Sequence, residues 1–155
     1  MKYLITLCLL MPMSLLQASD FIQEGDTIIY ASSEDHDITM ENVQMAIADK
    51  GLRVSGTLHI SDMLNRTAKD LEIKNNVFIK AESIEFCSAL WSHKMVQLDP
   101  LNLNVCPFTI AVYIKTDEPE QVYVAFRQPY ISSKQDSPLR AEIIQALHDI
   151  VSDSI

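Results

Sequence analysis

The sequence predicts a two-layer α+β domain, in which an antiparallel sheet carries the long helices on one face. Two observations support this fold class. Segments typical of strands and helices alternate in the order strand, helix, strand, helix, strand, short helix, strand, strand, helix. The last two strands, residues 108–115 and 122–127, are joined by the tight turn "TDEPEQ", so we expect them to pair antiparallel.

The first 18 residues predict a secretory signal peptide. Lys2 precedes an uncharged apolar stretch from Leu4 to Leu16, and Gln17, Ala18 and Ser19 follow as a small, polar exit. The apolar stretch is too short to cross a bilayer comfortably. We therefore expect cleavage after Ala18 and a periplasmic or secreted chain with no stable membrane anchor, the alternative being a retained anchor.

The rest of the chain predicts one domain. Residues 19–26 are interpreted as a short polar lead-in, and residues 27–155 are long enough to bury a core of their own. The whole sequence has a formal net charge of −9. An acidic domain repels phosphate backbones and anionic membrane surfaces, so nucleic acid is not expected as a partner.

The N-terminal half of the domain begins with a strand and a helix. Residues 27–32, "TIIYAS", are rich in β-branched and aromatic side chains, which is typical of a strand. Apolar residues at helical spacing follow. Asp35 or Asp37 is the expected N-cap of this helix, and Gly51 lies just after its C-terminal end.

The next segments predict another strand and helix before the first cysteine. Residues 52–60 alternate between apolar and polar side chains, which indicates a half-buried strand with His59 on its polar face. Ser61 is the expected N-cap of a helix over residues 62–73. Residues 83–87, "SIEFC", predict a strand.

Two further helices are predicted in the C-terminal half. Residues 89–98 predict a short helix that ends at an Asp-Pro pair. The last helix is expected to begin at Pro138, a favoured first helical residue, with Ser137 as its N-cap. Leu147 lies at the centre of the apolar face of this helix, so we expect it to anchor the core.

Cys87 and Cys106 are the only cysteines outside the predicted leader, and they predict a disulfide. One ends a strand and the other precedes a strand, so the chain between them can double back. The alternative is a metal-, haem- or redox-active site that uses these two cysteines. His93 and Met95 do not add to such a site, because residues two apart on a helix do not converge on one ion.

The outer faces of the last two strands carry an unusual set of side chains. Tyr113, Tyr123 and Arg127 fall on these faces by the period of two, together with two alanines. His59 is expected on the same side of the sheet. Tyrosine and arginine are enriched in interfaces, so this candidate face predicts binding of a small ligand or of a second copy of the chain. The alternative is an ordinary exposed surface.

No motif of a nucleophilic or metal-dependent enzyme is present, and the chain has only 3 glycines, so no phosphate-binding loop is expected. We therefore expect a non-enzymatic binding or interaction module without a cofactor. A hydrolase would require His59 to lie beside a carboxylate such as Glu85. His36, within "EDHD", and His148 are both expected to be exposed.

Four stretches resemble the domain of unknown function 302 family: "ADKGLRV", "LHIS", "FCSALWSHKMVQLDP" and "VCPFTIAVYIKTDEPEQVYVAFRQP". The resemblance runs from about Thr27 to about Ile150. Cys87-Ser88-Ala89 replaces the Gly-Asn-Pro-like turn of most members, which resembles a cysteine-bearing secreted subset. The resemblance implies a TATA-binding-protein-like β-α-β4-α arrangement, and it implies no activity, because none is agreed for the family.

Overall fold

The structure is a computed structural model that describes residues 21–132 and 138–155. Its strands and helices, in chain order, are β1 (Phe21–Glu24), β2 (Thr27–Ser32), α1 (His36–Asp49), β3 (Arg53–His59), α2 (Ile60–Ala68), β4 (Phe78–Cys87), α3 (Ala89–Leu98), the 3-10 helix η1 (Pro100–Val105), β5 (Phe108–Lys115), β6 (Val122–Arg127) and α4 (Pro138–Ser152).

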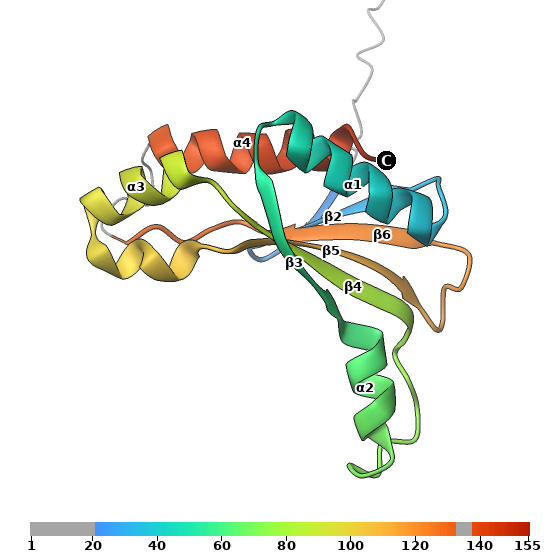
Figure 1. The fold of residues 1–155 in the computed structure, drawn as a ribbon. Coiled ribbons are helices and arrows are strands. Elements are labelled where there is room, and N and C mark those ends of the chain that lie inside the picture. The colour runs from blue at the N-terminus through green and yellow to red at the C-terminus, as the bar shows by residue number, and fades with distance from the viewer. Residues whose placement is uncertain (1–20, 133–137) are drawn as a thin grey trace, which may run out of the picture.

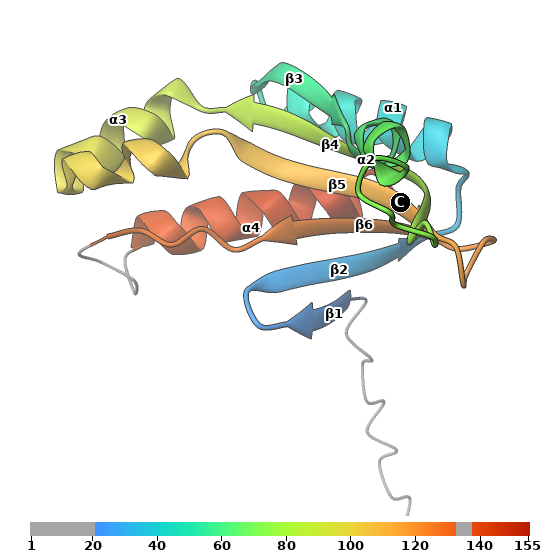
Figure 2. The ribbon, with the colours of Figure 1, turned by 90° about the horizontal axis from the view of Figure 1, so that it is seen from below.

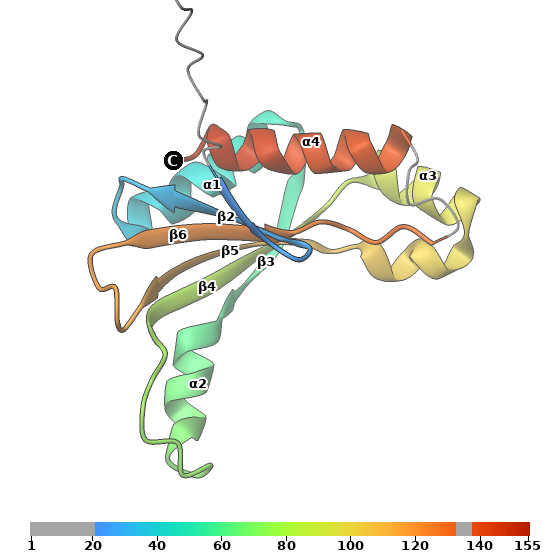
Figure 3. The same ribbon diagram turned by 180° about the vertical axis from the view of Figure 1, so that it is seen from behind.

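The six strands form one antiparallel sheet in the order β1-β2-β6-β5-β4-β3. Helices α1 and α4 lie side by side over one face of the sheet, as Figures 1 and 3 show from opposite sides. The succession β2-α1-β3-β4-β5-β6-α4 is the predicted β-α-β4-α arrangement, with α2, α3 and η1 inserted between strands. The predicted α+β fold class is confirmed.

The core lies between this sheet face and helices α1 and α4. Every second residue of the central strands points into it, which is the result expected from a period of two. Val112, Val124, Ile143 and Leu147 are almost completely buried there. Trp91 and Met95 of α3 extend the core past the end of the sheet. The predicted core position of Leu147 is therefore confirmed.

Helix α1 has the ends that the sequence predicts. The side chain of Asp35 accepts a hydrogen bond from the amide of Ile38, 3.1 Å away, so Asp35 and not Asp37 is the N-cap. Gly51 adopts a φ of +71° just after the helix, a conformation that glycine reaches without a steric penalty.

Two predicted boundaries differ from the structure. Residues 19–26 are not only the predicted polar lead-in, because they contain strand β1, which pairs with β2 across a turn with Gly25 at a φ of +60°. Helix α2 begins at Ile60, and its N-cap is His59 and not Ser61. The side chain of His59 makes no capping hydrogen bond, so a search for capping side chains could not find this start.

Helix α2 also departs from the prediction that the long helices share one face. It leaves the edge of the sheet and stands on the side away from α1 and α4 (Figure 1).

No helix in the two described ranges is long and apolar enough to cross a membrane. The predicted signal peptide and Ser137 lie outside the described residues.

The expectation that His148 is exposed is wrong. Its ring packs against Phe21 and Phe126, with ring centroids 5.0 and 5.1 Å apart. The hydroxyl of Tyr30 lies 2.5 Å from Nδ1 and donates to it when the imidazole is neutral. Burial lowers the pKa of His148 from its ordinary value of 6.5. His148 therefore joins α4 to β1, β2 and β6 as a neutral aromatic ring.

We expect His148 to make the stability of the protein depend on pH. Because its pKa is lower in the folded chain, the unfolded chain binds more protons below pH 6.5. The free energy of unfolding should therefore fall as pH drops through about 6.5. Denaturant unfolding of the parent and His148→Gln at several values between pH 5 and 8 checks this. The slope should flatten in His148→Gln but stay unchanged in His93→Gln, whose ring is exposed; equal slopes in all three would contradict it.

Candidate functional site

The outer face is the face of the sheet that α1 and α4 do not cover, and Figure 2 looks at it directly. Strand pairing arranges its residues in rows that run across the strands. The middle row is Leu58, Ser83, Ala111, Ala125, Ile29 and Ile22, from β3 to β1. On one side of it lies the row Ala81, Tyr113, Tyr123 and Ala31, and on the other side the row Glu85, Thr109, Arg127, Thr27 and Glu24. At the centre of the middle row, Ser83, Ala111 and Ala125 form a floor of small side chains, called here the alanine floor, between an aromatic row and a charged row.

The aromatic row is held together by its own contacts. Tyr113 and Tyr123 stack with ring centroids 5.4 Å apart and planes 22° apart. Phe78 meets Tyr113 edge-on at 5.6 Å, and Nζ of Lys115 lies 5.0 Å from the centre of the Tyr123 ring. The hydroxyl of Tyr123 donates to the carboxylate of Glu118. This hydrogen bond raises the pKa of Tyr123, so its hydroxyl stays neutral.

Arg127 lies at the other end of β6, two rows away from Tyr123. It is exposed, and it makes no ion pair with any residue in the described ranges. Arg127 lies four residues further along the strand than Tyr123, a distance of about 13 Å. The structure therefore places Tyr113 and Tyr123 together, as predicted, and Arg127 apart from them. One ligand atom cannot contact all three.

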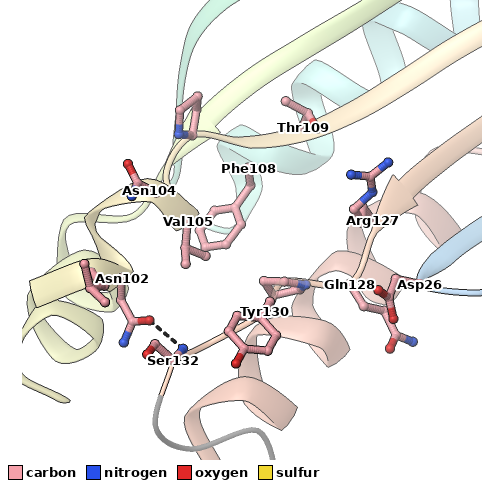
Figure 4. Close-up of a pocket in the computed structure, with 13 residues that line it drawn as sticks. Asp26, Asn102, Asn104, Val105, Phe108, Thr109, Arg127, Gln128, Tyr130 and Ser132 are labelled. Carbon is pink, nitrogen blue, oxygen red and sulfur yellow. Dashed lines mark hydrogen bonds between the residues drawn. The ribbon is translucent and has the colours of Figure 1, made fainter. Parts of the chain in front are cut away.

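Arg127 instead lines a hollow of about 700 Å³ between the end of β6 and η1, shown in Figure 4 and called here the Arg127 hollow. Its walls are apolar, aromatic and amide side chains with two charged residues, Asp26 and Arg127. The other residues that line it are Leu101, Asn102, Asn104, Val105, Pro107, Phe108, Thr109, Gln128, Pro129, Tyr130 and Ser132. A second hollow, of about 380 Å³, continues from Arg127 and Thr109 onto the alanine floor. Cavities of several hundred Å³ are the size of small-molecule sites.

The wall that faces Arg127 is fixed by a buried amide. Asn102 is 2% exposed; its Nδ2 donates to the carbonyl of Met95 at 2.9 Å, and its Oδ1 accepts from the amide of Ser132 at 2.7 Å. Asp99 caps η1 by accepting from the amide of Leu101 at 2.9 Å. This wall cannot be found from the sequence, because its residues come from two segments about 30 positions apart and follow no motif.

The same wall is joined to the sheet by a disulfide between Cys87 and Cys106, whose Cα atoms lie 5.8 Å apart. This is the predicted pair, and the separation is within the usual range for a bridge. While the bond is intact, neither sulfur is a thiolate that could bind a metal. Within the two described ranges, no group of three or more His, Cys, Asp or Glu side chains is arranged to hold a metal ion.

The prediction that His59 shares the outer face is wrong. A bulge between Val54 and Gly56 inserts one extra residue into β3. One extra residue moves all later side chains to the opposite face. Leu58 therefore joins the outer face and is 50% exposed, while His59 lies opposite Glu82 and its Nδ1 contacts that carboxylate. The carboxylate beside His59 is Glu82, and Glu85 lies on the other face.

His36 lies on the other side of Glu82 and was expected in an exposed turn. It is 4% exposed, and its Nε2 donates to the carbonyl of Val112 at 3.2 Å. Its Nδ1 lies 3.8 Å from the Glu82 carboxylate. The sequence did contain a signal, because position 36 precedes Met40 by four residues and Val43 by seven, so it belongs to the buried stripe of α1.

Comparison with known proteins agrees with this fold. The model of the family "Domain of unknown function DUF302" matches residues 28–153. The chain belongs to the DUF302 family. A DUF302 protein of known structure, the uncharacterized conserved protein DUF302 from Bacillus stearothermophilus, superposes with a TM-score of 0.69 at 12% identity, over 85% of this chain and 100% of that one. This likeness to a DUF302 structure shows the fold alone. Among curated proteins, none matches the chain.

Proposed function

We propose that the protein is a non-enzymatic binding module of the periplasm or the extracellular space, and that the Arg127 hollow binds a small molecule with a carboxylate and an apolar part. The observation that carries this proposal is the position of the Arg127 guanidinium. This group is exposed, has no ion-pair partner in the described ranges, and lies where the two hollows meet. Arginine binds carboxylates with two parallel hydrogen bonds, which suits this position.

The remaining lining supports a ligand with a larger apolar part. Phe108, Pro129 and Tyr130 provide apolar and aromatic surface, and Asn104 and Gln128 provide amide groups that can orient a polar substituent. Asp26 lines the same hollow. Its negative charge favours ligands with one negative group over ligands with two, such as phosphate esters.

The second candidate, a metal-, haem- or redox-active protein that uses Cys87 and Cys106, requires the two thiols to be free. Their disulfide joins the wall of the hollow to the sheet, which favours a structural role for this pair. The predicted leader and the disulfide together support a location outside the cytosol.

Octanoate and benzoate are suitable probes for the Arg127 hollow, with octanamide and benzamide as uncharged controls. The carboxylates should raise the melting temperature and the amides should not. A ligand that binds only the folded state stabilises it, and only the carboxylates carry a negative charge that Arg127 can bind. Arg127→Gln should weaken carboxylate binding roughly 10- to 100-fold, the value of one hydrogen bond between charged groups.

Arg66→Gln is the matched control for this experiment, because Arg66 is an exposed arginine on α2 outside the hollow. It should bind the probes as the parent does. Equal binding by Arg127→Gln and Arg66→Gln, or no binding of either carboxylate at millimolar concentration, would contradict the proposal. Isothermal titration calorimetry measures each affinity directly.

A further inference from the structure

The alanine floor is a depression in the outer face of the sheet. Ala111 and Ala125 pair directly across β5 and β6, and each is half-buried. Alanine is depleted in strands, which favour β-branched and aromatic side chains. The next row of the same two strands carries Tyr113 and Tyr123, whose stacked rings are much larger. The two alanines therefore leave open space on the face of the sheet, beside the tyrosine pair.

This space is continuous with the Arg127 hollow. The hollow of about 380 Å³ over the alanine floor shares Arg127 and Thr109 with the Arg127 hollow. On β6, Ala125 lies about 7 Å from Arg127 along the strand, and Tyr123 lies about 13 Å from it. A ligand whose carboxylate binds Arg127 can therefore extend across the floor as far as the tyrosine pair.

The chemistry of the floor selects the part of a ligand that can lie on it. In the part of the chain that the structure describes, the middle row of the outer face contains no charged residue. The backbone groups of β5 and β6 are used in pairing with each other and with β4 and β2. A peptide laid over this face would bury N–H and C=O groups without partners, which is costly. An alkyl chain has no such groups and gains from leaving water.

The Arg127 hollow, in contrast, suits the head of a ligand better than an alkyl chain. Asn104, Gln128 and Asp26 line this hollow. An alkyl chain packed against them would remove water from polar groups and return no hydrogen bond. A carboxylate accepts hydrogen bonds, and the exposed guanidinium of Arg127 can donate two to it. The two hollows therefore divide a fatty acid into a head at Arg127 and a chain on the alanine floor.

We propose that the alanine floor binds the alkyl chain of the ligand, so that the small molecule held by Arg127 is a medium- or long-chain fatty acid. This inference rests on the proposed carboxylate site and names the class of ligand that the site takes. The tyrosine pair forms the wall at the far end of the floor. Tyr123 is fixed there by its hydrogen bond to Glu118 and by Lys115 over its ring.

The length of the chain gives the first test. Isothermal titration calorimetry compares hexanoate, octanoate, decanoate and dodecanoate, each below the concentration at which it forms micelles. Full burial of one CH₂ group raises affinity about fourfold, and a chain on an open floor is covered on one side. Each added CH₂ group should therefore raise the affinity roughly twofold. Equal affinity for hexanoate and dodecanoate would overturn the chain site.

Filling the floor gives the second test. Ala125→Leu occupies the space over β6, so it should weaken dodecanoate binding at least about 10-fold more than benzoate binding, because the ring of benzoate does not extend across the floor. Ala111→Leu fills the same space from β5 and should have the same effect. Ala141→Leu is the matched control, because Ala141 is an exposed alanine on α4, which covers the opposite face of the sheet. It should bind every probe as the parent does.

The chain site and the carboxylate site can fail separately. If Ala125→Leu weakens benzoate and dodecanoate equally, or if Tyr130→Ala weakens dodecanoate and neither alanine variant does, the chain does not lie on the floor. Benzoate binding that requires Arg127 would then leave the carboxylate site standing. If Arg127→Gln binds benzoate and dodecanoate as tightly as the parent, the carboxylate site is wrong, and the fatty-acid proposal is overturned with it.

Discussion

Leu147→Ala is expected to lower the free energy of unfolding by about 2–5 kcal/mol. Leu147 is 1% exposed and lies in the middle of α4, where its side chain is part of the core cluster between the sheet and helices α1 and α4. Removing three of its carbon atoms loses their burial and leaves a cavity that a sheet on one side and a helix on the other cannot fully close. Chemical denaturation monitored by circular dichroism measures the change.

The control for this substitution is Leu103→Ala. Leu103 is 71% exposed, so the same change of side chain should alter the free energy of unfolding by less than about 0.5 kcal/mol. Ile143 and Ile150 face the same core from α4, and each is completely buried. If Leu147→Ala unfolds at the same denaturant concentration as the parent, α4 does not hold the core in the way the structure places it.

The parts of the fold that the sequence predicts are those set by local period and by turns. The hairpin of β5 and β6 follows from two alternating segments and a six-residue connection. Helix α1 follows from an aspartate N-cap and a glycine just after its end. These features depend on residues close in sequence, so composition and spacing are enough to find them.

The prediction of which side chains share a face fails where one extra residue in a strand turns the later side chains to the opposite face. No side chain at the bulge in β3 marks its position in the sequence, because Ser55 fits an uninterrupted strand as well as a bulged one. The alternation of residues 52–60 therefore gave the correct element and the wrong face for His59. For His36 the sequence gives two conflicting signals. Its acidic neighbours indicate an exposed turn, whereas its spacing of four residues to Met40 indicates the buried face of α1.

The candidate site was predicted in part. Tyr113, Tyr123 and Arg127 do share one face of the sheet, since β5 and β6 pair in the expected register. The Arg127 hollow itself could not be predicted, because Asn102, Tyr130 and Asp26 come from three separate segments. Their proximity depends on how η1 folds back against the chain after β6, and no local pattern describes that contact.

Breaking the Cys87–Cys106 disulfide is expected to lower the free energy of unfolding by about 2–4 kcal/mol. The bond closes a loop of 19 residues that contains α3 and η1. Closing such a loop removes conformations from the unfolded chain, and this loss of entropy is the main source of the stabilisation. The double variant Cys87→Ser, Cys106→Ser, compared with the parent in denaturant, measures the effect without adding a reductant.

The reductant itself provides the control, because it should destabilise the parent and leave the double variant unchanged. Two free thiols in the denatured mature chain, without reductant, would contradict the disulfide. The folded variant should keep α3 in place, since two hydrogen bonds of the parent do not involve the cysteines: Trp91 donates to Glu142 at 2.9 Å, and the amide of Ser132 donates to Asn102 at 2.7 Å.

The same bond should also affect the Arg127 hollow. Cys106 directly follows η1, which supplies Asn102, Asn104 and Val105 to the wall opposite Arg127. Without the disulfide, this wall is held to the sheet by hydrogen bonds and packing alone, so it should sample more positions and bind octanoate more weakly. Arg127 remains on β6 in that variant. A loss of affinity in the folded double variant would therefore come from the wall and not from the cation, whereas unchanged affinity would show that the ligand contacts only the β6 side of the hollow.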